Sequence, residues 1–124
     1  MIFLVTILSC NKKNTEYHSI TGSWRCEELN PLYGTSIYMV DIDVSRSDTT
    51  IFLLSNFLNT DFNEFIYAHL SGSTLTLPDQ TFAAMRVKSG TGIVSEDFTT
   101  IGFDYNIFDG QSDIKVHANY TRPD

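Results

Sequence analysis

The chain has 124 residues, of which 42% are hydrophobic and sixteen are aromatic (nine Phe, six Tyr and one Trp). This length and composition suffice for one domain with a single core. The formal net charge is −7, and the acidic residues are dispersed, which indicates solubility. A surface that binds nucleic acid, or that holds a membrane electrostatically, needs clustered Lys and Arg, so the composition argues against both.

The first element in chain order is an apolar run from Ile2 to Leu8. It is about one-third of the roughly 20 apolar residues that a transmembrane helix needs, so a membrane span is excluded and a signal segment is expected. An ordinary first strand or a disordered tail is the alternative interpretation.

Ile7-Leu8-Ser9-Cys10 resembles the lipobox of bacterial lipoproteins. The resemblance implies that residues 1–9 are a cleaved signal peptide and that Cys10 carries a diacylglyceryl anchor in the cell envelope. Two acyl chains give the durable membrane attachment that one chain does not. Asn11 replaces the Asp that retains many lipoproteins in the inner membrane, so by this resemblance the outer membrane is expected.

The two cysteines distinguish a lipid anchor from a disulfide. A bond between Cys10 and Cys26 would contribute about 3 kcal/mol for a loop of roughly 15 residues, whereas lipidation of Cys10 forbids it. In the second case Cys26, two residues after Trp24, is expected to be a buried and inert thiol. The polar residues that follow Cys10 then form a tether over 10–19, and the folded domain spans 20–124.

From Ile20 onward the apolar residues recur with a period of two, and helical spacing is nearly absent. Turn signals such as Ser71-Gly72 and Asp109-Gly110 separate the strands, and Ser89 to Gly92 predicts a bulge or sharp bend within the sixth strand. The eight predicted strands span 20–29, 36–45, 49–54, 64–70, 73–77, 82–94, 98–108 and 113–121.

Eight sequential strands with short turns and one apolar face each predict an all-β antiparallel meander. Such a meander hides its apolar face in a sandwich or in a closed barrel. An eight-stranded antiparallel up-and-down β-barrel is favoured over the sandwich because closure also removes exposed edges. The interior of a barrel of this size is filled by side chains or holds one small ligand.

Gly22-Ser23-Trp24 resembles the G-x-W signature of lipocalins and related calycins. The resemblance implies a lipocalin-like barrel whose Trp24 packs across the closed end against an Arg near the end of the last strand. Arg122 lies where that partner is expected, and a cation–π contact of about 0.5 to 2 kcal/mol would join the first strand to the last. The segments 55–57, 70–78 and 120–123 are also similar to those of small lipocalin-like envelope lipoproteins of bacteria, which are generally of unassigned function.

The predicted interior leaves two possibilities open. In the first it is an apolar calyx for a small hydrophobic ligand; in the second the same side chains interdigitate as a filled core. The expected ligand-binding residues are Tyr38, Met85, Phe103, Tyr105 and Tyr120. The whole predicted interior comprises residues 24, 26, 38, 40, 42, 51, 53, 66, 68, 70, 75, 77, 85, 87, 101, 103, 105, 116, 118 and 120.

No catalytic residues, cofactor or metal are expected. Glu27, Asp41 and Asp43 form a conceivable carboxylate pair or group, but a solvated strand face shows the same pattern. The oxygen-rich stretch from Asn59 to Glu64 lacks the spacing and glycine of a calcium loop. The three histidines at 18, 69 and 117 are too scattered for a structural zinc site.

A protein-interaction or structural module with a filled core is the alternative to ligand binding. The aromatic and apolar residues Tyr33, Phe57, Leu58, Phe62 and Phe65 lie in or beside predicted loops, where they meet a partner or pack locally. A protein partner at the 57–65 loop is therefore the alternative hypothesis, and the chain is expected to be a monomer.

Overall fold

The computed structural model describes residues 16–123, so the predicted signal peptide and Cys10 lie outside the described residues. The described part is built almost entirely of β-strands, as the period-2 pattern predicts. The elements are β1 (Gly22–Asn30), β2 (Gly34–Val44), β3 (Ile51–Ser55), the 3-10 helix η1 (Phe57–Asn59), β4 (Phe65–Ser71), β5 (Thr74–Leu77), β6 (Gln80–Phe82), β7 (Met85–Val94), β8 (Thr100–Phe108) and β9 (Asp113–Thr121).

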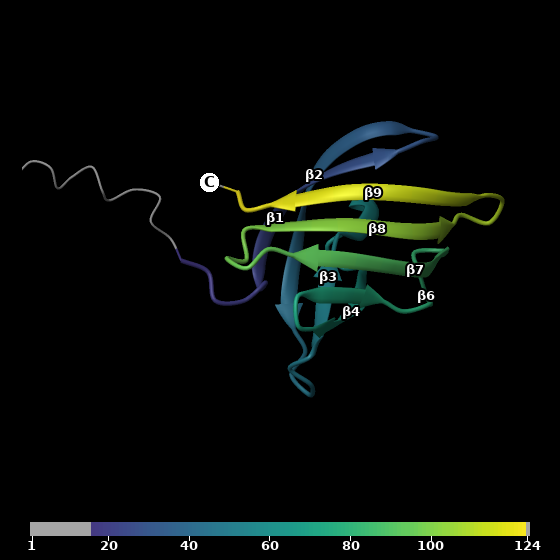
Figure 1. The fold of residues 1–124 in the computed structure, drawn as a ribbon. Coiled ribbons are helices and arrows are strands. Elements are labelled where there is room, and N and C mark those ends of the chain that lie inside the picture. Colours follow the sequence, from purple (N-terminus) through teal and green to yellow (C-terminus); the bar gives the residue numbers. More distant parts are fainter. Residues whose placement is uncertain (1–15, 124) are drawn as a thin grey trace, which may run out of the picture.

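The strands form a closed barrel. Their order is β5-β4-β3-β2-β1-β9-β8-β7, and an antiparallel pairing of β5 with β7 closes the ring. Figure 1 shows β7, β8 and β9 crossing the front of the barrel, with β2, β3 and β4 behind them. The eight-stranded antiparallel up-and-down barrel predicted from the sequence is therefore confirmed, and the short β6 is an additional strand paired with the beginning of β7.

Alternation places one face of each long strand in the core. In β8 and β9 every second residue is buried, from Ile101 to Ile107 and from Ile114 to Tyr120. The buried face continues from strand to strand around the barrel, because Cys26 of β1 is paired with both Tyr38 of β2 and Tyr120 of β9. These three residues therefore occupy one level of the interior.

The predicted face of β3 is wrong. Phe52 and Leu54 are buried, whereas Ile51 and Leu53, predicted in the interior, are only half-buried. The segment is apolar at every position, so alternation cannot choose between its faces. Pairing decides, because Leu54 lies opposite Ile42, which points into the core.

The predicted sixth strand, 82–94, is two strands rather than one. β6 ends at Phe82 and β7 begins at Met85, with Ala83 and Ala84 in the left-handed region at φ of 46° and 63°. Alanine gives no sequence signal for such a turn, since this conformation is usually taken by Gly or Asn. The predicted irregularity is present as a register shift between Val87 and Ser89.

Leu70 and Met85, both predicted in the interior, and Val44, which continues the alternation of β2, are less buried than the rest of the interior face. Val44 is the last residue of β2 and is exposed, while Leu70 near the end of β4 and Met85 at the start of β7 are half-buried. All three lie near strand ends, where the neighbouring strands no longer cover the interior face completely.

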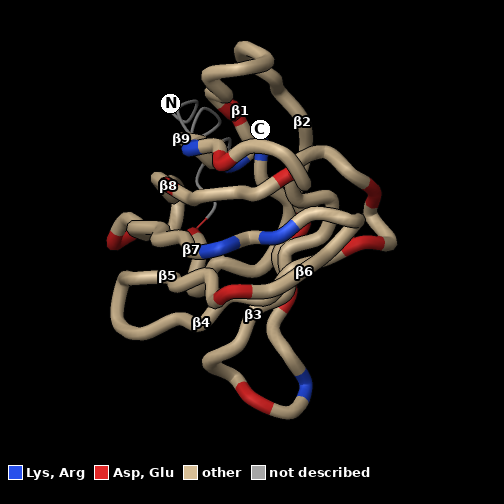
Figure 2. Tube along the Cα trace, turned by 90° about the vertical axis from the view of Figure 1, so that its right-hand side faces the viewer, with Lys and Arg blue, Asp and Glu red and all other residues tan. Residues whose placement is uncertain are grey.

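Charged residues are spread over the outside of the barrel. Figure 2 shows acidic segments on several strands and loops, with fewer basic segments among them. The ion pairs Arg86–Asp79 and Lys88–Asp113 have side chains about half exposed, so each contributes little to stability.

Candidate functional site

One end of the barrel is closed by Arg122 and Trp24. The Arg122 guanidinium lies over the Trp24 ring with its carbon 3.9 Å from the ring centroid, and over the Tyr17 ring at 4.0 Å. Trp24 is fully buried, and its Nε1 donates a hydrogen bond of 2.9 Å to the Ile20 carbonyl. A Cβ added to Gly22 would lie 3.0 Å from Arg122 Nη1, so the small residue of the G-x-W segment makes room for the guanidinium.

Three carbonyl oxygens hold the same guanidinium. Arg122 donates from Nε to Phe98 O (2.9 Å), from Nη1 to Thr21 O (3.0 Å) and from Nη2 to Ser19 O (2.7 Å). Partial burial lowers the pKa of Arg122 from its ordinary value. These contacts join the segment before β1, the β7–β8 loop and the end of β9, so this end of the barrel is a structural closure.

Replacing Arg122 with lysine is expected to lower the free energy of unfolding by about 2 kcal/mol. Lysine keeps the charge but loses the planar fork that reaches three carbonyls while stacking between two rings. Chemical denaturation of both proteins measures the difference. Arg46→Lys in the exposed β2–β3 loop is the control and should change stability by less than about 0.5 kcal/mol; equal effects of the two substitutions would contradict the structural role.

A chain of aromatic rings fills the interior from the closed end toward the other end. Neighbouring ring centroids along it lie 4.8 to 6.4 Å apart, which is the range of favourable aromatic pairs. In order, the rings belong to Trp24, Tyr120, Phe103, Tyr105, Phe57 and Phe82. The interior is therefore occupied by side chains over much of its length, as the filled-core interpretation expects.

The β3–β4 loop inserts Phe57 into this chain of rings. Phe57 is 0% exposed, so of the two alternatives given for this loop residue, contact with a partner or local packing, the structure shows local packing. Asn56 and Leu58, on either side of it, have φ of 65° and 59°, and this backbone turns the ring inward. The Asn56 side chain donates to Met39 O at 2.8 Å, which ties the loop to β2.

The other end of the barrel holds a pocket of about 290 Å³. It lies between the β1–β2 turn, η1 and the adjoining ends of β7, β8 and β9. We call the buried Phe57 ring at the start of η1 the plug. Of the five predicted ligand-binding residues, Tyr38 and Met85 line it, whereas Phe103, Tyr105 and Tyr120 belong to the aromatic chain. The apolar wall consists of Leu58, Met85, Ile107, Ile114 and Val116.

A buried carboxyl group lies in the wall of this pocket. Glu28 is only 7% exposed, and the Tyr38 hydroxyl donates a hydrogen bond to its Oε1. Burial raises the pKa of Glu28 above its ordinary value of 4.5. The hydroxyls of Tyr105 and Tyr120 are also buried and have no hydrogen-bond partner among the described residues, so the interior next to the pocket is more polar than its sequence suggests.

Cys26 lies deeper, between Tyr38 and Tyr120 in the register. Burial raises the pKa of its thiol to about 12. The thiol therefore stays protonated at neutral pH, and a thiol is a weak nucleophile compared with a thiolate. This agrees with the inert thiol expected from the sequence.

Glu28 is the residue that sequence reasoning missed. Trp24 and Cys26 were assigned to the interior, and the same alternation continues to position 28. A glutamate at an interior position next to a strand end is itself the signal, because Glu is rarely buried without a partner.

The pH dependence of stability tests this burial. Because the pKa of Glu28 is raised in the folded protein, the folded state binds the proton more tightly than the unfolded chain does, and stability falls as the pH rises above about 4.5. At pH 8 we expect Glu28→Gln to raise the free energy of unfolding by roughly 1 kcal/mol relative to the parent, and therefore to unfold at a higher temperature. The difference should shrink at pH 4, as thermal unfolding at both pH values will show; a difference independent of pH would contradict it.

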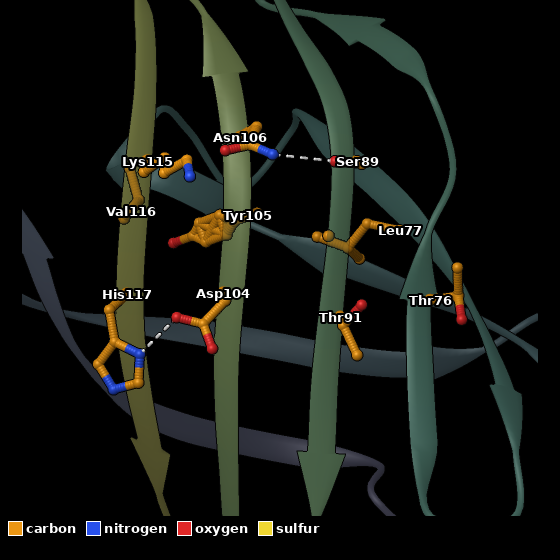
Figure 3. Close-up of a pocket in the computed structure, with 11 residues that line it drawn as sticks. Thr76, Leu77, Ser89, Thr91, Asp104, Tyr105, Asn106, Lys115, Val116 and His117 are labelled. Carbon is orange, nitrogen blue, oxygen red and sulfur yellow. Dashed lines mark hydrogen bonds and ion pairs between the residues drawn. The ribbon is translucent and has the colours of Figure 1, made fainter.

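An open hollow of about 570 Å³ lies on the outer face of β5, β7, β8 and β9 (Figure 3). His117 Nδ1 and Asp104 Oδ1 are 2.8 Å apart, and Asn106 Nδ2 donates to Ser89 Oγ at 3.1 Å. Figure 3 shows these as two separate pairs. The serine is bonded to the amide rather than to the imidazole, so the hollow does not present a serine activated by histidine.

The conceivable carboxylate group of Glu27, Asp41 and Asp43 is not assembled. Register places Glu27 opposite Ile37, four residues along β2 from Asp41, which accepts a hydrogen bond of 2.7 Å from Ser23 Oγ. Within residues 16–123 there is no group of three or more His, Cys, Asp or Glu side chains arranged to hold a metal ion. Asp61 accepts the backbone N–H of Asn63 at 2.7 Å, a contact typical of a polar turn.

The fold and the site define a closed eight-stranded antiparallel barrel with one end sealed by an Arg–Trp stack and a pocket at the other. This architecture is compatible with a lipocalin-like fold. No family model and no curated protein matches the chain. In the described range, no helix has the length and hydrophobicity to cross a membrane.

Proposed function

We propose that this protein is a lipid-anchored protein of the bacterial cell envelope that binds a small, largely apolar molecule at the open end of its barrel. The observation that carries the proposal is the pocket of about 290 Å³, which combines an apolar wall with the buried Glu28–Tyr38 pair. Ligand sites commonly combine apolar walls with a few placed polar groups.

The aromatic chain limits the size of the ligand. The pocket has room for about ten water volumes of ~30 Å³ each, and Phe57 and Tyr105, 4.8 Å apart, block the route farther into the barrel. A molecule of roughly ten non-hydrogen atoms fits, whereas a long acyl chain would remain largely outside. The proposed ligand is therefore smaller than the lipids that a deep calyx would enclose.

A neutral ring compound tests binding at this end. We expect 2-phenylethanol, added to the purified chain, to bind saturably and to shift the NMR signals of residues around the pocket. Fatty acids of increasing length should not gain affinity with each added CH₂. Replacing Ser36, an exposed residue of the pocket wall, with Trp should fill the pocket and weaken binding about tenfold or more.

The matched control is Thr76→Trp in the outer hollow, which should leave binding of 2-phenylethanol unchanged. No saturable binding, or equal loss in both tryptophan variants, would contradict a ligand site at the open end.

The anchor part of the proposal rests on the lipobox resemblance at residues 7–10. Tyr17 and Ser19 contact Arg122 at the closed end, so a lipid at Cys10 would approach the barrel from the end opposite the pocket. The mouth would then face away from the membrane. Mass spectrometry of the native N-terminus tests the anchor, and residues 1–9 retained on an unmodified Cys10 would contradict it.

A protein partner at the 57–65 loop is the second candidate function. Phe62 and Phe65 support it, because they are 51% and 52% exposed and large aromatic residues are costly in contact with water. Combined replacement of both with serine should abolish capture of a partner from envelope extracts and leave 2-phenylethanol binding intact.

A further inference from the structure

The open-end pocket is acidic. Glu28 and Asp109 are its charged side chains, and none of the described residues that line it is Lys, Arg or His. Asp109 accepts the backbone N–H groups of Gln111 and Ser112 at 2.9 and 2.8 Å, and these bonds lower the pKa of its carboxyl group. The mouth of the pocket therefore carries a negative charge at neutral pH.

Glu28 has unused capacity to accept hydrogen bonds. A carboxylate offers about four lone-pair sites; the Tyr38 hydroxyl donates to one oxygen, and the Asn30 side chain is a second hydrogen-bonding neighbour, so sites remain for a ligand. The titratable groups that interact with it from the neighbouring strands are Tyr38, Tyr105, Tyr120 and Cys26, and none of them carries a positive charge. A buried carboxylate without a cation is costly, so a cationic group placed in this pocket would relieve the cost.

The remaining wall suits an organic cation. Tyr33 and Tyr38 bring two phenol rings to the pocket, and aromatic rings attract cations through their faces. Ile107, Ile114 and Val116 provide an apolar surface beside them. The pocket thus combines an anion, aromatic rings and an apolar wall within a small volume.

We propose that the ligand of this pocket is a small protonated amine on an apolar or aromatic body, with its ammonium group bonded to Glu28 and its body against the apolar wall. The proposal rests on the function proposed above and names the chemical class of the ligand. A carboxylate ligand of the same size would meet two like charges and is disfavoured.

Three probes of matched size but different charge test this inference. They are 2-phenylethylamine, 2-phenylethanol and phenylacetate, titrated into the purified chain by calorimetry at pH 7.5. A charge-assisted hydrogen bond predicts that the amine binds about tenfold or more tightly than the alcohol, and that the acid binds more weakly than both.

Variants locate the effect at Glu28. Glu28→Gln should weaken binding of the amine about tenfold more than it weakens binding of the alcohol, so that the preference for the amine is lost. Tyr33 is 72% exposed, so Tyr33→Leu is expected to change stability little and should weaken binding of the amine about two- to fivefold. Asp104→Asn, on the outer face, is the matched carboxylate control and should change neither.

The outcomes separate the two proposals. Saturable binding of the alcohol without preference for the amine would overturn the inference and leave the open-end site in place. Equal affinity of the amine for the parent and Glu28→Gln would also overturn it, because the attraction would then come from the overall charge of −7. Failure of all three probes to bind at millimolar concentration would count against the proposed function itself.

Discussion

Replacing Phe57 with alanine is expected to lower the free energy of unfolding by about 3 to 5 kcal/mol. The ring is fully buried and packs against Tyr105 and Phe82 at centroid distances of 4.8 and 5.6 Å. Its removal leaves a cavity that the closed barrel cannot collapse to fill, because the strands around it are joined in a ring. For a domain of this size the midpoint of thermal unfolding should fall by about 15 to 25 °C.

Phe62→Ala in the same loop is the matched control. Phe62 is half exposed, so its loss should change stability by less than about 0.5 kcal/mol. Thermal and urea unfolding of the two variants measure the contrast. Similar stability of both variants would show that the β3–β4 loop does not plug the barrel.

Removal of the plug has a consequence for binding as well. Phe57 packs against Tyr105 in the interior, and the next residue, Leu58, lines the open-end pocket. In Phe57→Ala protein that folds, larger ring compounds should bind, while 2-phenylethanol should bind no more tightly than to the parent. The contrast between Phe57 and Phe62 thus distinguishes an internal plug from an external contact surface in one loop.

The barrel was predictable from the sequence because its long strands alternate strictly. In β8 and β9 each apolar residue has a polar neighbour, and the Asp109-Gly110 turn joins the two strands where predicted. Where the sequence does not alternate, it does not predict which face of a strand is buried. The face of β3 depends on the pairing of Leu54 with Ile42, a contact between strands that no local pattern encodes.

The plug and the acidic pocket were harder to predict for different reasons. The direction of Phe57 depends on the left-handed backbone at Asn56 and Leu58, and leucine gives no signal for that conformation. Glu28, in contrast, follows from the alternation of Trp24 and Cys26. Because Glu28 is charged, it would normally be assigned to the surface. Buried glutamate is rare and is retained only where a partner or a function compensates.

Gly92→Ala is expected to have the next largest effect, a loss of about 3 kcal/mol of stability at the upper end of the usual range for overpacking. A Cβ at this position would lie 2.5, 2.7 and 2.9 Å from three carbons of the Phe103 ring. The ring is itself held between Tyr105 and Tyr120, at centroid distances of 6.2 and 4.9 Å, so it cannot move aside without disturbing the aromatic chain.

Gly102→Ala separates this steric effect from the general effect of replacing a glycine in a strand. A Cβ at Gly102 would have one neighbour, Asn119 Oδ1, at 4.0 Å. That substitution should be neutral or stabilising by up to about 1 kcal/mol, because alanine reduces the conformational freedom of the unfolded chain. Urea unfolding of both variants measures the difference, and equal effects would contradict the role of the Phe103 ring.

A double-mutant cycle tests directly whether the Phe103 ring is what excludes a methyl group at position 92. Phe103→Leu in the parent should be destabilising because it removes part of the aromatic chain, yet in the Gly92→Ala background it should cost much less or restore stability, because leucine leaves room for the methyl group. The two positions lie opposite each other in the β7–β8 register. A cost of Phe103→Leu that is the same in both backgrounds would show that the methyl group is accommodated elsewhere. Coupling between them would show that Gly92 is required by the ring that fills the barrel.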